Sequence, residues 1–254
     1  MKKEEYEVAV RILISVFALT ILCSVTMASE PGYEITIPKL TAPPNIDGVL
    51  DDAVWQVAPT ALVEHLNTDA GDPVDAVYVA TAMAAYDDSK LYVAFRNGEP
   101  NPGAITTVSP GHDDSVWADD EIELFIEPAL AGAQPYYHIM INAANVTQDD
   151  ESGGAGADWE PALESAVSIG ADYWAIELAI PFADLGMTSA PDGQTWGWNF
   201  NRHIVSGVDY WVAWATTGAG FHTPERFGQL TFGEVLASVD PSTKLATSWG
   251  SLKQ

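Results

Sequence analysis

The sequence predicts an all-β protein, an antiparallel β-sandwich of the immunoglobulin-like or jelly-roll type with about ten strands. Several short runs alternate between apolar and polar residues, which is the pattern of a strand with one face on a core. In residues 121–127, for example, Ile122, Leu124 and Ile126 share one face. Turn-forming residues arrive roughly every 8–15 positions, and no run keeps a helical period.

The expected strands follow one another with short connections. Residues 77–86 and 91–96 form one predicted hairpin, and residues 166–170 and 173–181 form another. Residues 181–186 fit a single helical turn. In chain order, strands are expected at residues 33–38, 77–86, 91–96, 121–127, 135–145, 166–170, 173–181, 196–203, 210–215 and 226–232.

The first 28 residues have the features of a secretory signal peptide. Lys2, Lys3 and Arg11 precede an apolar run at residues 12–25, and Ala28 is a small residue suited to a cleavage site. A retained membrane anchor is the alternative, although the run is shorter than the ~20 residues that a span needs. We therefore expect a secreted, periplasmic or cell-surface protein.

One domain is expected after the leader. The predicted organisation is a signal peptide at residues 1–28, a β-sandwich at 29–240 and a tail at 241–254. The single cysteine, Cys23, lies inside the leader. A mature protein cut after Ala28 would therefore have no disulfide and no thiolate chemistry.

The chain is strongly acidic, with a formal net charge of −26. Such a charge disfavours binding to nucleic acid and, beyond the leader, to anionic membranes. A saline habitat or bound divalent cations would both suit this acidity. Residues 149–158 are expected to form a surface loop, and their oxygens could hold calcium, although solvation is the simpler reading.

The most suggestive chemistry lies around the strand at residues 121–127. Trp117 precedes it, and Glu123 lies on the face opposite Ile122 and Leu124. An aromatic ring beside a carboxylate suits a sugar, whose C–H face stacks on the ring while its hydroxyls donate to the carboxylate. The alternative is a buried tryptophan above a solvated edge strand.

Seven phrases in order resemble the family 9 carbohydrate-binding modules and their sandwich-fold relatives. They are NIDGVLDDAVW, YDDSKLYVAF, VWADDEIELFIEP, YYHIMINAAN, IELAIPFADLG, WGWNFNR and PERFGQLTF. The resemblance covers about residues 37–232 and implies a β-sandwich that binds sugars without cleaving them. It also implies that the protein acts together with glycoside hydrolases on xylan or cellulose. Bound calcium in a structural role is implied as well.

The resemblance also assigns site residues. The two aromatics that sandwich a sugar in the family match Trp117 and Phe221, and the family's glutamate matches Glu123. His138 stands where an arginine is expected, and Phe221 stands where the best-known members have tryptophan. Both departures bear on affinity and sugar preference.

Other polar and aromatic residues are expected to have lesser or structural roles. Asn142 and Asn201 point to the polar faces of their strands and could add contacts to sugar hydroxyls. Trp55, Trp174 and Trp198 lie on apolar faces and are predicted to belong to the core.

An enzyme is not predicted. Glycoside hydrolysis needs two opposed carboxylates, and Glu123 with Glu177 is the obvious pair to nominate. Nothing in the sequence places the two across one cleft. No G-x-S-x-G or H-E-x-x-H motif occurs either.

Two further functions remain open at this stage. Some relatives of this sandwich bind haem b, and Met140 lies near His138 on the same predicted face. Two such neighbours cannot be opposite axial ligands, so His203 or Met187 would have to supply the second one. The other alternative is a surface interaction domain that has lost its ligand.

Overall fold

A computed structural model describes residues 32–152, 156, 158–218 and 220–235. Thirteen strands account for most of the regular structure, with short 3₁₀ turns between them. The strands are β1 (Glu34–Lys39), β2 (Thr60–Val63), β3 (His65–Leu66), β4 (Ala80–Tyr86), β5 (Lys90–Gly98), β6 (Glu121–Glu127), β7 (Tyr136–Asn142), β8 (Thr147–Ser152), β9 (Glu164–Ile169), β10 (Tyr173–Pro181), β11 (Thr195–Ile204), β12 (Tyr210–Ala213) and β13 (Gly228–Val235). The turns are η1 (Ala53–Gln56), η2 (Ala76–Tyr78), η3 (Pro102–Ala104), η4 (Val116–Ala118), η5 (Phe182–Leu185) and η6 (Pro224–Arg226).

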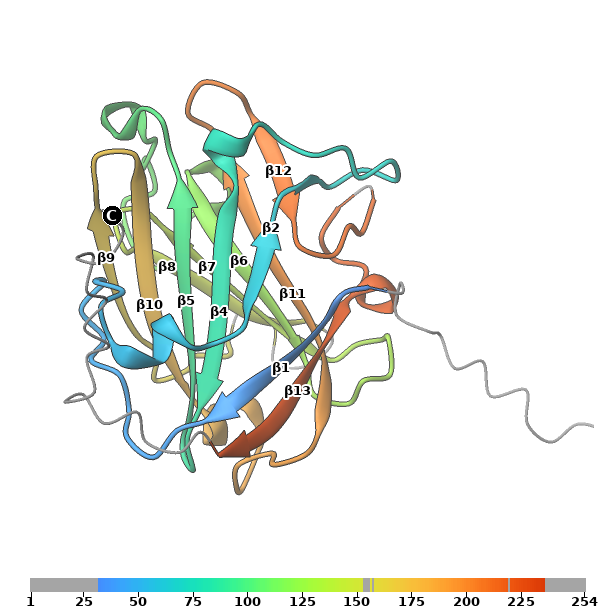
Figure 1. Cartoon of the computed structure of the whole chain (residues 1–254). Coiled ribbons are helices and arrows are strands. Elements are labelled where there is room, and N and C mark those ends of the chain that lie inside the picture. Colours follow the sequence, from blue (N-terminus) through green and yellow to red (C-terminus); the bar gives the residue numbers. More distant parts are fainter. Residues whose placement is uncertain (1–31, 153–155, 157, 219, 236–254) are drawn as a thin grey trace, which may run out of the picture.

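The strands form one curled sheet whose two halves face each other as a sandwich. The order is β8-β7-β6-β11-β13-β1-β4-β5-β10-β9, with β12 beside β11 and β2 beside β4. In Figure 1, β4, β5 and β10 pass in front of β6, β7 and β8. The expected β-sandwich is confirmed.

The sheet is mixed: the predicted antiparallel pairing is confirmed for most of the strands, and β1 is the exception. β1 pairs in parallel with β13 on one side and with β4 on the other. β1 is thus the link between the two halves, and the remaining ladders are antiparallel. No alternation in a single strand reveals which direction its partner runs, because both pairings use the same side-chain period.

The core lies between the two halves and is built from the alternating apolar residues. Phe95 of β5 packs edge-on against Phe200 of β11, with ring centroids 5.6 Å apart. Trp174 and Trp198 are fully buried in this core, as expected. Arg202 of β11 also crosses it and donates to the Gly98 carbonyl oxygen over 2.7 Å. Contacts across the core therefore fix the two halves against each other.

β6 lies in the middle of its half, between β7 and β11, and all seven of its residues are buried. The solvated edge strand is therefore excluded. Two of its glutamates bind backbone: Glu121 accepts from the His203 N–H, and Glu127 accepts from the N–H groups of Ala131 and Gly132. Glu123, whose side chain is on the same face, is the one that reaches the cavity described below.

A second buried glutamate, Glu177 of β10, lies on the outer face of the opposite half and binds the segments that cover it. It accepts from Trp55 Nε1 at 2.6 Å and from the backbone N–H groups of Asp47 and Gly48 at 3.0 and 2.8 Å. Gly48 has φ +81°, and a Cβ there would lie 2.7 Å from the Val167 carbonyl carbon. The predicted turn at Asp47 and Gly48 therefore requires glycine and is fastened to β10 through Glu177.

Glu123 and Glu177 do not share a cleft. Ile122 and Leu124 flank Glu123 and point into the common core, so Glu123 points out of one half. Ile176 and Leu178 do the same around Glu177 in the other half. The two carboxylates lie on opposite outer faces, which removes the nominated catalytic pair.

The predicted strands are recovered, with three additions. β2, β3 and β8 were not expected, and β8 occupies the start of the predicted 149–158 loop. β8 reads TQDDES, which has no apolar alternation, and its pairing with β7 defines it as a strand. The leader at 1–28, with Cys23, and the tail at 241–254 lie outside the described residues. Nor do the residues that the structure describes include a helix long and apolar enough to cross a membrane.

Replacing Glu177 with alanine should lower the free energy of unfolding by about 3 kcal/mol, because two buried N–H donors and one part-buried N–H donor lose their acceptor. Denaturant unfolding of the purified variant measures this. Glu164→Ala is the matched control, since its exposed carboxylate pairs only with Lys90 at the surface. Equal stability of the two variants would contradict this role of Glu177.

Candidate functional site

A cavity of about 820 Å³ opens on the outer face of the half formed by β6, β7 and β8. Its lining comes from Trp117 in η4, the outward side chains of β6 to β8, Trp211 in β12, and two loop segments, residues 67–69 and residues 218 and 220–222. Cavities of about 300–1,000 Å³ are typical of small-molecule sites. The size and the mixture of apolar and polar lining therefore suit a small ligand.

Strand register places the polar side chains of the floor. Glu123 pairs with Met140, and His138 pairs with Asp150 on the next strand. Because side chains alternate along a strand, Glu123, His138 and Asp150 all point outward from adjacent strands. Gln148 joins them two residues before Asp150.

Glu123, His138 and Asp150 form a linear network. His138 Nε2 lies 2.5 Å from Glu123 Oε2, and His138 Nδ1 lies 3.2 Å from Asp150 Oδ2. Burial alone would lower the pKa of His138, but the two carboxylates outweigh it and raise the pKa to about 9. The imidazolium is therefore the form present at neutral pH, and it donates to a carboxylate on each side.

Glu123 keeps one oxygen for a ligand. Its Oε2 accepts from His138, whereas Oε1 has no hydrogen-bond partner among the described residues. Glu123 is 3% exposed, and it lines the cavity. The pairing with cationic His138 makes a buried carboxylate tolerable at this position.

Aromatic rings support His138 from two sides. Phe125 stacks on it with centroids 4.1 Å apart and an interplanar angle of 16°, and His222 meets it edge-on at 4.8 Å. Burial, together with the charge of His138, lowers the pKa of His222. His222 is further fixed by the Tyr136 hydroxyl, 2.8 Å from its Nδ1. The floor is thus rigid.

Two exposed indoles border the cavity. Trp117 is 52% exposed and Trp211 is 38% exposed. His203 connects them, because it stacks on Trp211 at 3.7 Å and its Nδ1–H donates to the Trp117 carbonyl oxygen at 2.8 Å. The Trp211 ring and the backbone of Trp117 are therefore held in place without a ligand.

The loops beside Trp211 are tied to the same frame. Asn67 donates its backbone N–H to the Trp211 carbonyl oxygen, and its Oδ1 accepts from the Thr217 N–H at 2.7 Å. Arg226 pairs with Asp69 at 2.8 Å and donates to the Thr217 carbonyl oxygen. These contacts join the 67–69 loop to the loop that carries Phe221.

Four of the predicted site residues line this one cavity: Trp117, Glu123, His138 and Phe221. Phe221 differs from the expectation, because only 4% of it is exposed. It packs with Phe125, Tyr136 and Phe227 and meets Trp211 edge-on at 5.6 Å. It therefore offers a buried wall and supports Trp211, whereas Trp211 presents its ring at the surface.

The two predicted asparagines lie outside the cavity lining. Asn142 is fully buried, donates to Asp119 at 2.8 Å and accepts from the N–H groups of Ala144 and Val146. Asn142 thus closes the β7–β8 turn and has no amide atom left for a hydroxyl. Asn201 pairs with Glu123 in register but is fully buried, and its amide atoms have no partner among the described residues.

Sequence reasoning missed Trp211, His222 and Asp150 as cavity residues. Trp211 pairs with His203 across β11 and β12, and that ladder brings it to the same face as Glu123. Alternation in residues 210–215 does separate Trp211 from Val212 and Trp214, which face the core. That pattern alone could have nominated Trp211 as the outward ring.

The contacts do not favour haem. Both ring nitrogens of His138 face carboxylates, and both ring nitrogens of His203 face protein oxygens, at Trp117 and at Asp209. Met187 packs against the main core. None of these histidines presents a free nitrogen to an iron atom.

Comparison with protein families gives a match over residues 46–234 to the family described as "Carbohydrate family 9 binding domain-like". The chain belongs to this family. No curated protein sequence matches the chain.

Solved structures share the fold of this family 9 domain. A family 9 carbohydrate-binding module from Caldicellulosiruptor kristjanssonii, in complex with glucose, has a TM-score of 0.62 at 16% identity, over 82% of this chain and 100% of that one. Its complex with cellotriose gives 0.61 at 15% identity, with the same coverage. A candidate carbohydrate-binding protein from Bacteroides uniformis gives 0.62 at 17%, over 78% and 98%.

The raised pKa of His138 predicts that this domain loses stability in alkali. A histidine whose folded pKa is raised contributes stability fully below its unfolded pKa of about 6.5 and loses it as pH rises through the folded value, here about 9. The stability advantage of wild type over His138→Gln should therefore be largest near pH 6.5 and shrink toward pH 10. Denaturant unfolding across that range measures it, and a constant difference would contradict a protonated His138.

Proposed function

We propose that this chain binds carbohydrate, without cleaving it, in the cavity bordered by Trp117 and Trp211. The observation that carries the proposal is the pair of exposed indoles above a floor in which Glu123 is hydrogen-bonded to His138. Membership of the family supports it, as do the two similar domains whose structures hold glucose and cellotriose.

The residues supply the two kinds of contact that a sugar needs. An indole ring covers the apolar C–H face of a pyranose, and Trp117 and Trp211 offer two such rings. Hydroxyl groups need acceptors and donors, and Glu123 Oε1 is an acceptor without a partner among the described residues. Gln148 and Asp150 add polar groups on the same floor. We assign the stacking to the two tryptophans, with Phe221 as the wall behind Trp211.

The wider role is also a proposal. We infer that the protein acts outside the cytoplasm, where plant-type polysaccharides such as xylan or cellulose are degraded, and that a glycoside hydrolase supplies the catalysis. The engagement of Glu177 with Trp55 and the 47–48 turn supports a non-catalytic chain, because it keeps the nominated partner of Glu123 on the other half of the sandwich.

Trp117→Ala and Trp211→Ala should each weaken sugar binding by about 10- to 100-fold, because each loses one stacking surface worth ~1.4–2.8 kcal/mol. Calorimetric titration with glucose, cellotriose and xylo- and manno-oligosaccharides identifies the ligand and measures the loss. Ile169→Ala is the control, because Ile169 is exposed on β9, far along the sheet from the cavity. A folded wild type that binds none of these sugars would overturn the proposal.

Glu123→Gln should weaken binding by about tenfold, because hydrogen bonds to an ionised acceptor are stronger than those to an amide. Glu127→Gln is a matched control, since Glu127 is a buried glutamate on the same strand and face but does not line the cavity. The same titration, with the best sugar of the panel, measures both. A loss in Glu127→Gln as large as that in Glu123→Gln would exclude Glu123 as the acceptor.

A further inference from the structure

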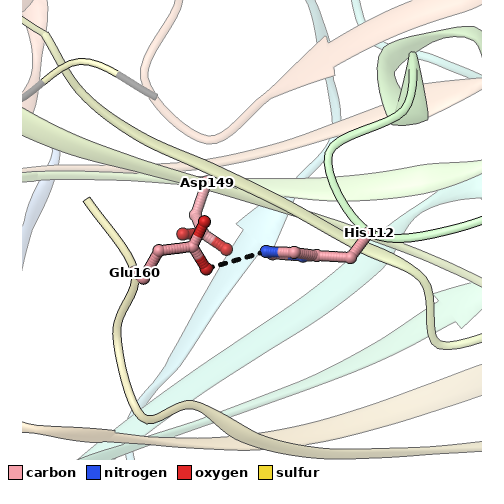
Figure 2. A group of neighbouring side chains, drawn as sticks. All are labelled: His112, Asp149 and Glu160. Atoms are coloured by element: carbon pink, nitrogen blue, oxygen red, sulfur yellow. Dashed lines mark hydrogen bonds and ion pairs between the residues drawn. The ribbon is translucent and has the colours of Figure 1, made fainter. Parts of the chain in front are cut away.

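A second cluster lies on the reverse of β8. Gln148 and Asp150 face the cavity, whereas Asp149 pairs with Ile139 and therefore points to the inner side of the sheet. His112, from the loop before η4, and Glu160, from the segment after β8, reach Asp149 there. Figure 2 shows both carboxylates directed at the His112 ring. One ligand atom of each residue lies within 4.8 Å of the other two.

Asp149 is the unusual member of this cluster. Its side chain is 3% exposed, and Oδ1 is buried with no hydrogen-bond partner among the described residues. Burial raises the pKa of this carboxyl to about 7, although His112 opposes the shift. A buried carboxylate oxygen without a donor needs a compensating group, and a cation directed at that oxygen would supply it.

His112 is oriented as a metal-binding imidazole is. Its Nδ1 lies 2.8 Å from Thr147 Oγ1 and 3.1 Å from the Thr147 carbonyl oxygen. A carbonyl oxygen only accepts, so Nδ1 carries a hydrogen, and Nε2 is left to face Glu160 Oε2 at 2.9 Å. Histidines that bind metals are commonly fixed in this way, with the second nitrogen donating to a backbone carbonyl.

We propose that His112, Asp149 and Glu160 bind a divalent transition-metal ion, and that zinc suits them best. Zinc takes imidazole nitrogen and carboxylate oxygen together, with bonds of about 2.0–2.2 Å and usually four ligands. The ligand atoms of a tetrahedral site are then about 3.4 Å apart, which the present cluster reaches with small side-chain shifts. The ion replaces the proton between His112 Nε2 and Glu160 Oε2, now 2.9 Å apart, and water completes the coordination.

Calcium fits this donor set less well. It takes about six to eight oxygen ligands and avoids nitrogen. The cluster instead offers one imidazole nitrogen and two carboxylates, which is a set that zinc accepts. Calcium binding by residues 149–158 stays a separate prediction.

Because of the position of this cluster, a bound ion would link two segments of the chain. The Asp113 N–H donates to the Thr147 carbonyl oxygen, and the Val116 N–H donates to Gln148 Oε1. The loop that leads to Trp117 is therefore already tied to β8. A metal ion between His112 and Asp149 adds a stronger link between the same two segments.

Zinc titration of chelator-treated, tag-free protein in a Cys23→Ser background tests the site, because a histidine tag or the single thiol would bind zinc itself. Wild type should bind one ion per chain with a raised melting temperature, and Asp149→Asn should bind at least tenfold more weakly. Glu160→Gln and His112→Gln should show the same loss. Cobalt(II) in place of zinc should give visible absorption bands in wild type that Asp149→Asn lacks.

Asp172→Asn is the matched control, since it removes an equally charged but exposed carboxylate on the far half of the sheet, and it should bind zinc as wild type does. Circular dichroism verifies that each variant is folded. Equal zinc binding by wild type and Asp149→Asn would mean that the ion sits on surface carboxylates, and would overturn the proposal. So would a folded wild type that binds no zinc, or one in which calcium binds in preference to zinc at these residues.

Discussion

Buried carboxylates determine how this half of the sandwich is built. The segment from Asp119 to Glu127 places five of them out of solvent, and a buried charge is tolerated only with partners. Asp119 accepts from the N–H groups of Val108 and Ser109, and Asp120 accepts from those of Thr106 and Val205. Loops that lack regular structure are thereby fastened to β6. The same requirement at Glu123 recruits His138, and so the acidic strand organises both the frame and the floor of the cavity.

The two exposed tryptophans depend on this frame. Trp117 follows the loop that Asp119 and Asp120 hold, and Trp211 is stacked on His203, whose backbone N–H donates to Glu121. The Trp211 ring and the backbone at Trp117 are therefore held before any ligand arrives. A rigid aromatic surface loses little side-chain entropy on binding, which favours affinity for a ligand as polar as a sugar. The buried carboxylates beneath the cavity and the exposed tryptophans at its border are therefore two parts of one arrangement.

The sequence predicts the features that depend on a local pattern of residues. It does not predict the features that depend on which segments pair in the fold. Period-2 alternation identified β6, and the spacing of Trp117 and Glu123 identified two cavity residues. Alternation could not tell that the Asn142 amide would bind Asp119, because that contact joins the end of β7 to the residue after η4, which is distant in the chain. It also missed β8, whose polar sequence resembles a loop until β7 pairs with it. Trp211 needed the β11–β12 register, and Phe221 lost its surface to packing by Phe125, Tyr136 and Phe227.

β8 shows why the two faces of one strand cannot be treated separately. Charged residues on an edge strand commonly prevent aggregation, but here consecutive aspartates have distinct partners. Asp150 faces outward and accepts a hydrogen bond from His138, whereas Asp149 faces inward toward His112 and Glu160. Because both belong to a strand held mainly by its ladder to β7, a shift of β8 would move Asp150 away from His138 and alter the support of Glu123. A contact that fixes the position of Asp149 therefore also fixes Asp150, on the cavity side of the same strand.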